Sequence, residues 1–564
     1  KRKILVVFAG AFAMIFVLIG RLTYLMVFDA EYYQKKAEDL HERERDIKAA
    51  RGEILDRNGK VLATNRTVCT ISVIHSQIRE AETVIDNLSE LLEMNSSEVR
   101  KRVEKISSIE RIKSNVDKKT GDKIRNLGMA GVKVDEDFKR FYPYDALASK
   151  VLGFTGADNQ GIIGLEVKYD KYLKGVDGKI LTTTDARGIE LDGVAEDRKE
   201  PVAGNTLKIS LDYNMQKYAM QMAEKVRQEK QAEKTAILLM NPQNGEIYAM
   251  VNVPEFNLNR PFELNTEEES DENMTDEQKQ DALNQMWRNG CINDTYEPGS
   301  TFKTASIMVA LEDGHITPDY EVDTGNGIKM MYGRAMRDWN WHRGGYGRIN
   351  VTRILEVSSN VGTSSIIDQF YHDKPQKFVD GLKRMSIDQP LHLQISGEGK
   401  PNIKGPKERY FAKTTLPWMS IGYETQVPPM NILTFYNAIA NNGVMVRPKF
   451  VRAAVKDGEV VKEFPTEVIN PKICSDNTLK QIQEILYKVV HQGLAGPAGS
   501  KQFAVSGKTG TAQNRGHDHS AFIGFAPMDK PKIAIAVYVE NGGWGATYGV
   551  PYGALMMEQY LNGK

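Results

Sequence analysis

The order of strand-like and helical patterns in the C-terminal part of the chain constrains its fold most strongly. Residues 237–240 and 246–253 are apolar, strand-like runs, and Gln243-Asn244-Gly245 between them is typical of a tight turn. A mainly helical middle follows, and residues 520–527 and 532–540 are strand-like again. Strands at both ends with helices between them predict an α+β domain built on one antiparallel sheet that helices flank.

Three short polar motifs occur in this part of the chain, in a defined order. Ser300-Thr301-Phe302-Lys303 is the only S-x-x-K sequence in the chain, Ser358-Ser359-Asn360 is an S-x-N, and Lys508-Thr509-Gly510 is a K-T-G. Each motif alone is weak evidence, because the chain contains a second K-T-G at Lys119 and a second S-x-N at Ser475. We interpret the former as a surface turn and the latter as a helix N-cap, since neither context suggests chemistry.

The spacing of the first motif has a chemical meaning. Glu297-Pro298-Gly299 predicts that a loop ends before Ser300 and that Ser300 begins a helix, so that Lys303 lies one turn later on the same face. A serine hydroxyl becomes a good nucleophile only when a base takes its proton. A lysine can be that base if burial or a nearby cation such as Lys508 lowers its pKa. Taken alone, Ser300 also fits a helix N-cap and Lys508 a solvated hairpin residue.

The N-terminal residues predict attachment to a membrane. Lys1-Arg2-Lys3 precedes an apolar run over residues 4–20, and the apolar character resumes after Arg21 up to Phe28. About 20 apolar residues span a bilayer, and positive charges favour the cytoplasmic side. We therefore predict a transmembrane signal anchor over residues 1–28, with the N-terminus in the cytoplasm and the rest outside. A cleaved signal peptide is the alternative, but no A-x-A site follows the run.

The segment between this anchor and residue 205 offers no nucleophile–base pair, so we expect residues 29–204 to be a binding or spacer module and residues 205–564 to be the catalytic domain. Within the former, Asn58-Gly59 predicts a hairpin turn, and residues 78–112 are helical in pattern. Thr275 and Gln278 predict a capping box for a helix that runs to Trp287. The loop that contains Trp339, Trp341 and His342 lies between the first two motifs, so a position at the border of the cleft is one alternative, but we favour a packed loop.

Composition excludes several classes of function. Lys+Arg and Asp+Glu are both 74, so the formal net charge of zero does not indicate a nucleic-acid partner. The three cysteines are widely scattered and form no C-x-x-C pair, so neither a zinc site nor a disulfide framework is indicated. We expect no metal and no cofactor.

The ordered trio of motifs is known from β-lactamases and penicillin-binding proteins. Over nearly its whole length the chain resembles the class B penicillin-binding proteins, which are monofunctional peptidoglycan transpeptidases, and within them the division and sporulation branch. Besides the trio, the resemblance rests on Arg51-Gly52 through Gly59, Leu152-Gly153-Phe154 with Gly156, Gly161 through Glu166, Glu297-Pro298-Gly299, and Ser420 through Glu424. No glycosyltransferase domain fits before the pedestal, which distinguishes the chain from class A.

The resemblance implies an architecture and roles for the matched residues. It implies a transmembrane helix, an elongated α+β pedestal that resembles a dimerisation domain, and a β-lactamase-like transpeptidase domain. It implies that Ser300 is the nucleophile, that Lys303 is the base and that Ser358 relays a proton. Asn360 would orient Lys303 and the substrate, and Lys508 would tune the site electrostatically. Thr509, Gly510 and Thr511 would bind the substrate, and the N–H groups of Ser300 and Thr511 would form the oxyanion hole.

The resemblance also implies partners. They are D-Ala-D-Ala stem peptides, β-lactam antibiotics, a membrane-embedded glycosyltransferase, and division or sporulation proteins at the bacterial cell membrane. Two alternatives remain open from the sequence. A D,D-carboxypeptidase or a β-lactam sensor would have the same active site, and a division scaffold would retain the motifs without activity.

Overall fold

The computed structural model describes residues 2–27, 42–107, 109–156, 158–183, 197–265, 274–514, 517–542 and 549–563. The chain divides into two compact units, and both are discontinuous in sequence. The first unit comprises Lys1–Arg51, Asn65–Lys139 and Lys174–Gly204, and the second comprises Gly52–Thr64, Arg140–Leu173 and Asn205–Lys564. Each unit has a hydrophobic core of its own.

The first unit combines short helices with two groups of strands. Its elements are α1 (Arg2–Val27), β1 (Glu42–Ile47), the later part of β3 (Val61–Val73), η1 (His75–Gln77), α3 (Ala81–Leu92), α4 (Ser96–Val103), β4 (Glu110–Asp117), α5 (Lys118–Asn126), β5 (Val132–Phe141), β6 (Gly178–Thr183) and β7 (Asp197–Lys199). Strand β6 pairs with β1 and β7, and β3 pairs with β4 and β5. The core of the unit lies among β3, β4, α3, α4 and α5.

The helical pattern over residues 78–112 is only partly realised. Helix α3 ends at Glu93, which has a φ of 50°, and the Asn95 side chain then accepts a hydrogen bond from Ser97 N and begins α4. A strand, β4, begins at Glu110. The prediction for the second K-T-G is wrong, because it lies in the first turn of α5, where Asp117 caps the helix by accepting a hydrogen bond from Thr120 N at 3.0 Å.

Helix α1 presents large apolar side chains to solvent, among them Phe12, Phe16 and Leu22. Within the described part of the chain, no helix combines the length and the apolarity that a membrane crossing requires.

The second unit contains most of the chain. Its strands are β2 (Ile54–Leu55), the beginning of β3, β8 (Thr206–Ile209), β9 (Lys234–Met240), β10 (Ile247–Val253), β11 (Glu321–Asp323), β12 (Ile328–Met331), β13 (Arg334–Arg337), β14 (Arg348–Asn350), β15 (Asn402–Ile403), β16 (Thr425–Gln426), β17 (Met445–Val446), β18 (Val451–Lys456), β19 (Glu459–Glu463), β20 (Val468–Asn470), β21 (Ser506–Asn514), β22 (His517–Ala526) and β23 (Ile533–Glu540).

Its helices lie mainly between the two sets of sheet strands in sequence. They are α6 (Ser149–Leu152), α7 (Gly164–Lys168), α8 (Asp170–Leu173), α9 (Tyr213–Lys230), α10 (Asp276–Trp287), η3 (Gly299–Phe302), α11 (Lys303–Glu312), η4 (Trp341–Arg343), α12 (Val351–Glu356), α13 (Asn360–Tyr371), α14 (Pro375–Arg384), α15 (Thr415–Ser420), α16 (Pro429–Ala440), α17 (Asp476–His491), η5 (Gly496–Ala498) and α19 (Val550–Leu561). The capping box predicted at Thr275 and Gln278 is present at the start of α10.

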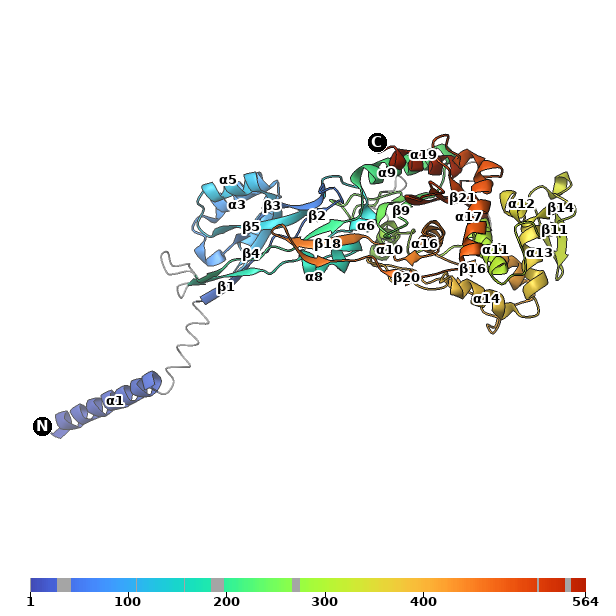
Figure 1. Cartoon of the computed structure of the whole chain (residues 1–564). Coiled ribbons are helices and arrows are strands. Elements are labelled where there is room, and N and C mark those ends of the chain that lie inside the picture. Colours follow the sequence, from blue (N-terminus) through green and yellow to red (C-terminus); the bar gives the residue numbers. More distant parts are fainter. Residues whose placement is uncertain are drawn as a thin grey trace. The chain divides into compact units, whose positions relative to one another are not determined.

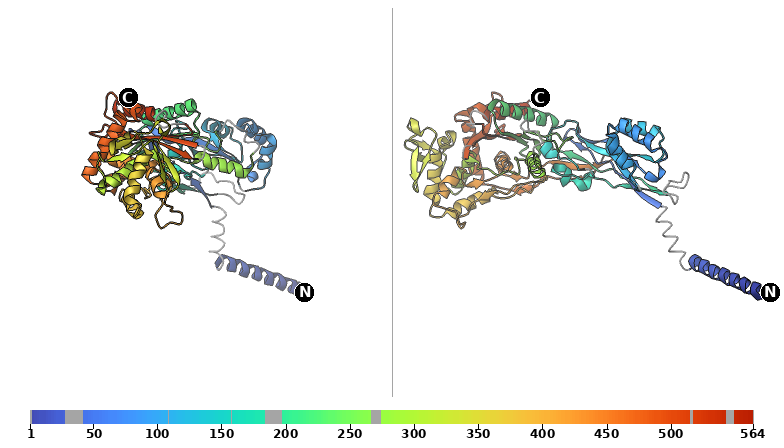
Figure 2. Two further views of the ribbon diagram at one scale, coloured as in Figure 1. Left: turned by 90° about the vertical axis from the view of Figure 1, so that its right-hand side faces the viewer. Right: turned by 180° about the vertical axis from the view of Figure 1, so that it is seen from behind.

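One antiparallel sheet, with the strand order β10-β9-β23-β22-β21, forms the centre of this unit (Figure 1). Helices α9 and α19 cover one face, α16 packs against the other, and α17 lies against β21 (Figures 1 and 2). The α+β prediction and both predicted strand pairs are therefore confirmed. Strand β21 is at the edge of the sheet, which leaves one of its sides open to a ligand.

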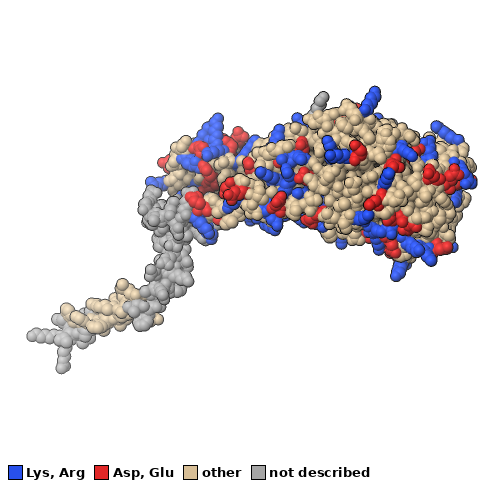
Figure 3. Space-filling view, viewed as in Figure 1, with Lys and Arg blue, Asp and Glu red and all other residues tan. Residues whose placement is uncertain are grey.

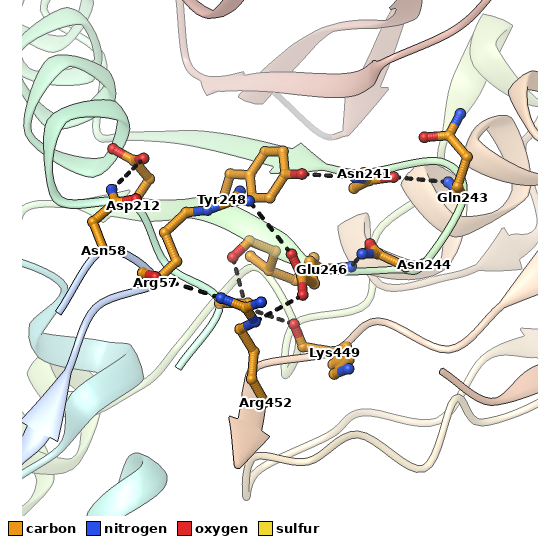
Figure 4. Close-up of polar contacts among 12 residues, drawn as sticks. Arg57, Asn58, Asp212, Asn241, Gln243, Asn244, Glu246, Tyr248, Lys449 and Arg452 are labelled. Carbon is orange, nitrogen blue, oxygen red and sulfur yellow. Dashed lines mark hydrogen bonds and ion pairs between the residues drawn. The ribbon is translucent and has the colours of Figure 1, made fainter. Parts of the chain in front are cut away.

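The predicted hairpin at Asn58-Gly59 is also present. Asp56 and Lys60 close the turn through a backbone hydrogen bond of 2.8 Å, and Gly59 has a φ of 90° that favours glycine. The turn is fastened to the rest of the second unit, since the Asn58 side-chain amide donates to Asp212 at 3.0 Å (Figure 4).

The Glu246 carboxylate forms ion pairs with two arginines from distant segments of the same unit (Figure 4). Its carboxylate lies 3.8 Å from the Arg57 guanidinium and 3.1 Å from that of Arg452 on β18, while the carboxylate itself is buried. The Arg57 guanidinium also lies 4.1 Å from the ring centroid of Tyr248. Segment Gly52–Thr64 is thus held to the rest of the second unit by ion pairs as well as by its strand pairing.

On the face visible in Figure 3, Lys and Arg are interspersed with Asp and Glu. That face shows no extended area of one sign, in keeping with equal numbers of the two kinds of residue.

Candidate active site

The three motifs, which are far apart in sequence, meet in the second unit. Ser300 lies in η3 directly before α11, and Lys303 is the first residue of α11. Ser358 lies in the short connection between α12 and α13, and Asn360 begins α13. Lys508 lies on the edge strand β21. The prediction that Ser300 begins a helix is confirmed, with a 3-10 turn as the first turn.

Glycines fix the backbone around Ser300. Gly299 has a φ of 54° and donates its N–H to the carbonyl of Gly422 at 3.2 Å. Gly422 has a φ of 83°, and a Cβ there would overlap the carbonyl oxygen of Gly299. A Cβ on Gly510 would lie 2.8 Å from the Thr301 side chain. Segment Ser420–Glu424 and β21 can therefore approach the nucleophile loop closely only because these positions lack side chains.

Two buried lysines converge on Ser358. Lys303 Nζ donates to the Ser358 carbonyl at 2.6 Å and lies 3.2 Å from Ser358 Oγ, and Lys508 Nζ lies 2.9 Å from the same Oγ. Lys508 also donates to the Thr509 carbonyl at 3.0 Å. Neither lysine is exposed to solvent. The Ser358 hydroxyl therefore bridges the two amines, whereas Lys303 makes no hydrogen bond to the Ser300 hydroxyl in this structure.

Burial controls the protonation of these amines. Burial lowers the pKa of Lys303 to about 7, although the Asp338 carboxylate partly opposes the shift. Burial, together with the nearby charge of Lys303, lowers the pKa of Lys508 well below its ordinary value. An amine with a pKa near 7 is a strong enough base to take a hydroxyl proton and is still substantially neutral at physiological pH.

Asp338 is a candidate site residue that the sequence did not indicate. Its carboxylate accepts hydrogen bonds from Ser359 Oγ at 2.8 and 3.0 Å and from Val361 N at 2.9 Å. Ser359 in turn caps α13, and Ser358 has a φ of 55°, an uncommon conformation for a serine. Asp338 therefore holds the strained S-x-N backbone and supplies a negative charge near Lys303. Nothing around Asp338 in the sequence distinguishes it from a surface loop aspartate.

A cleft of about 620 Å³ lies in front of these residues. Of the predicted site residues, Ser300, Ser358, Asn360, Thr509, Gly510 and Thr511 line it, whereas Lys303 and Lys508 lie behind its wall. Tyr423, Leu494 and Asp518 also line it and were not predicted.

The structure corrects the interpretation of the tryptophan loop. Trp339, Trp341 and His342 line the cleft, and the two tryptophan side chains are 39% and 44% exposed. The prediction of a packed loop is wrong, because the polypeptide around Asp338 is anchored to α13 and turns the adjacent aromatic side chains toward the cleft. A sequence pattern cannot show which residues of a Gly-rich loop face a ligand.

Comparison with known proteins agrees with the geometry. Residues 235–559 match the penicillin binding protein transpeptidase domain, and residues 46–209 match the penicillin-binding protein dimerisation domain. The chain is 31% identical to stage V sporulation protein D of Bacillus subtilis (strain 168), over 96% of this chain and 82% of that protein. It is 27% identical to the probable peptidoglycan D,D-transpeptidase PenA of Neisseria meningitidis serogroup A, over 95% of this chain and 87% of that protein.

Solved structures share the fold at lower sequence identity. Penicillin-binding protein 2X from Streptococcus thermophilus superposes with a TM-score of 0.74 at 20% identity, over 92% of this chain and 80% of that chain. A peptidoglycan synthetase from Bifidobacterium adolescentis superposes with a TM-score of 0.69 at 20% identity, over 93% and 96% of the two chains. These structures show the shared fold. The two family matches and the 31% identity to stage V sporulation protein D confirm the resemblance inferred from the motifs: the chain belongs to the class B penicillin-binding proteins, the transpeptidases of bacterial cell-wall synthesis.

Proposed function

We propose that the chain crosslinks peptidoglycan stem peptides as a D,D-transpeptidase, through an acyl-enzyme on Ser300. The observation that carries the proposal is the buried amine pair of Lys303 and Lys508, bridged by the Ser358 hydroxyl directly beside the cleft that Ser300 lines. Relatives named peptidoglycan D,D-transpeptidase support the choice of substrate.

In the first step Ser300 Oγ attacks the carbonyl of the penultimate D-alanine. Lys303, in its neutral form, takes the hydroxyl proton as the new C–O bond forms. The carbonyl oxygen becomes an oxyanion, and the backbone N–H groups of Ser300 and Thr511 stabilise it. The close approach of Gly299 to the Thr511 carbonyl, where a Cβ would lie 2.7 Å away, supports the juxtaposition of these two backbone segments.

In the second half of this step the C–N bond breaks and the terminal D-alanine leaves. Its amine needs a proton, and Lys303 returns it through the Ser358 hydroxyl, which already bridges the two lysines. The ester on Ser300 then reacts with the amine of a neighbouring stem peptide. Lys303 takes a proton from that amine and gives it back to Ser300 Oγ, so that a new amide bond and the free enzyme result.

The donor peptide lies along the open edge of β21. Thr509 and Thr511 hold its terminal carboxylate, and Gly510 keeps the strand close to the Ser300 loop. Asn360 orients Lys303 and the amide of the donor. Lys508 tunes the electrostatics of the site from its position 2.9 Å from the Ser358 hydroxyl.

The remaining parts of the chain serve this activity in our proposal. Residues 205–564 form the transpeptidase domain and residues 29–204 the pedestal. Residues 1–28 form a single-pass anchor in the cytoplasmic membrane, which the three N-terminal positive charges and the exposed apolar side chains of α1 support. A membrane-embedded glycosyltransferase that supplies glycan strands, together with division or sporulation proteins, completes the set of partners.

Product analysis with an acceptor amine tests the proposal. The chain, a donor peptide ending in D-Ala-D-Ala and a peptide with a free side-chain amine should give one crosslinked product for each D-alanine released in the transfer reaction. The Ser300→Ala variant should give neither product. Release of D-alanine without any crosslinked product would instead identify a D,D-carboxypeptidase, and acylation without turnover would identify a β-lactam sensor.

A further inference from the structure

The segment between β11 and α12 carries an excess of positive charge beside the cleft. Residues 324–350 contain Lys329, Arg334, Arg337, Arg343 and Arg348, against the single carboxylate of Asp338. Asp338 is only 2% exposed, and its oxygens are engaged by Ser359 and Val361. The Asp338 carboxylate is therefore occupied by the S-x-N motif, and it does not pair with Arg337, the one cation of this group that lines the cleft.

The backbone of Arg337 is held by the S-x-N motif. Its carbonyl accepts a hydrogen bond from the Asn360 side-chain amide at 2.8 Å, and the next residue, Asp338, is bonded to Ser359. Arg337 is therefore tied to the S-x-N motif through its backbone, and it is an exposed residue that lines the cleft. Among the described residues, no carboxylate oxygen lies within 4 Å of its guanidinium nitrogens.

Exposed tryptophans support the arginines of this segment. The Arg337 guanidinium lies 5.4 Å from the ring centroid of Trp341, and that of Arg343 lies 5.8 Å from the ring centroid of Trp339. An aromatic face steadies a guanidinium while leaving its N–H edge available. That edge matches the two oxygens of a carboxylate, which makes such a pair a suitable receptor for an acidic group.

We propose that Arg337, supported by Trp341, binds a carboxylate that the donor peptide carries upstream of its terminal D-Ala-D-Ala. This inference rests on the proposed function, in which the terminal carboxylate lies at Thr509 and Thr511 and the scissile carbonyl lies at Ser300. The part of the donor peptide that precedes the scissile carbonyl then lies beside Asn360. The Asn360 side-chain amide is hydrogen-bonded to the Arg337 carbonyl, so Arg337 lies next to this part of the peptide. An acidic side chain there meets an unpaired cation instead of bulk solvent.

Two donor peptides that differ in one group test this selectivity. Both end in D-Ala-D-Ala, and the residue upstream carries a carboxylate in one peptide and the corresponding amide in the other. For the natural chain we expect the acylation rate constant over KM to favour the carboxylate peptide about 3- to 10-fold, as for other partly exposed charge pairs. The preference should shrink as salt is added, because screening weakens a partly exposed pair.

Substitutions at Arg337 and Arg334 test whether Arg337 causes the preference for the carboxylate peptide. Arg337→Gln should reduce the ratio between the two peptides to about one, and Arg337→Lys should retain part of it because the charge remains without the planar fork. Arg334→Gln is the matched control: Arg334 is an exposed arginine of the same hairpin, lies 5.9 Å from the Trp418 ring and does not line the cleft. It should keep the full ratio. Since the ratio is taken within each variant, a general loss of activity cancels.

The outcomes separate this inference from the proposed function. Equal rates with both peptides in the natural chain, or an undiminished preference in Arg337→Gln, would overturn the role of Arg337. If penicillin still acylates Ser300 in that case, the proposed function stands. If neither peptide releases D-alanine and penicillin does not react with Ser300, the proposed function fails, and this inference fails with it.

Discussion

Lys303 is the single residue on which the proposed acylation step depends most. Lys303→Ala removes the base and leaves the Ser300 hydroxyl without a proton acceptor, so we expect penicillin acylation to slow by about 10²- to 10⁴-fold. Stopped-flow measurement of fluorescent penicillin binding gives this rate. Lys480→Ala, an exposed lysine on α17, is the control and should react at the natural rate. A loss of less than tenfold in Lys303→Ala would assign the base to another residue.

The pKa of Lys303 predicts how acylation depends on pH. The reactive form is the neutral amine, so the rate constant should rise as pH increases through about 7 and level off above it. Asp338 raises the pKa of Lys303, so Asp338→Asn should move the midpoint of this rise to lower pH. A rate profile with an unchanged midpoint in Asp338→Asn would show that Asp338 acts only through the position of Ser359.

The sequence identified some residues of the candidate site and missed others. Ser300, Ser358 and Lys508 were recognisable because the chemistry requires these residue types in this order. In the structure Ser300 and Ser358 line one cleft, and Lys508 lies 2.9 Å from the Ser358 hydroxyl. Asp338 was not recognisable, because its role arises only where the end of β13 meets the N-terminus of α13. Such a contact joins two segments whose sequences share no recognisable motif, so the sequence alone does not predict it.

At the level of elements, the loop that carries Ser300 depends on glycine packing. Gly422→Ala forces a Cβ against the Gly299 carbonyl. We expect it to lower the free energy of unfolding by about 2 kcal/mol more than the same substitution at a control glycine. We also expect acylation to be at least about tenfold slower. Gly458→Ala is the matched control, because Gly458 has a similar φ of 88° but no atom within 4 Å of the added Cβ. Chemical denaturation and penicillin kinetics measure both effects. Equal losses in the two variants would show that backbone strain alone, and not contact with Gly299, matters.

Local signals predicted some elements well and others poorly. The turn at Asn58-Gly59 and the helix caps at Thr275 and Ser475 were predicted because one or two residues determine them. The region 78–112 was not predicted correctly, because Glu93 and Asn95 end one helix and begin another within an otherwise helical pattern. Strand β4 then follows with pairing to β3 that no local pattern reveals.

For the whole molecule, the division of the chain into two interleaved units has a consequence for folding. Ile54 and Leu62 of the first hairpin, and Leu152, Phe154 and Leu165 of the segment Arg140–Leu173, are buried in the core of the second unit. Residues 205–564 expressed alone lack these side chains, so we expect them to unfold at a lower temperature than the full chain and with lower cooperativity. Differential scanning calorimetry tests this expectation. An unchanged transition for residues 205–564 would mean that the two inserted segments contribute little to the stability of the catalytic core.

The central claim is that Ser300 forms an acyl-enzyme. Incubation of the chain with a penicillin, followed by intact-mass measurement and peptide mapping, tests it most directly. We predict one covalent adduct for each chain, located on the peptide that contains Ser300 and absent from Ser300→Ala. An adduct on another residue, or equal labelling of Ser300→Ala, would contradict the claim.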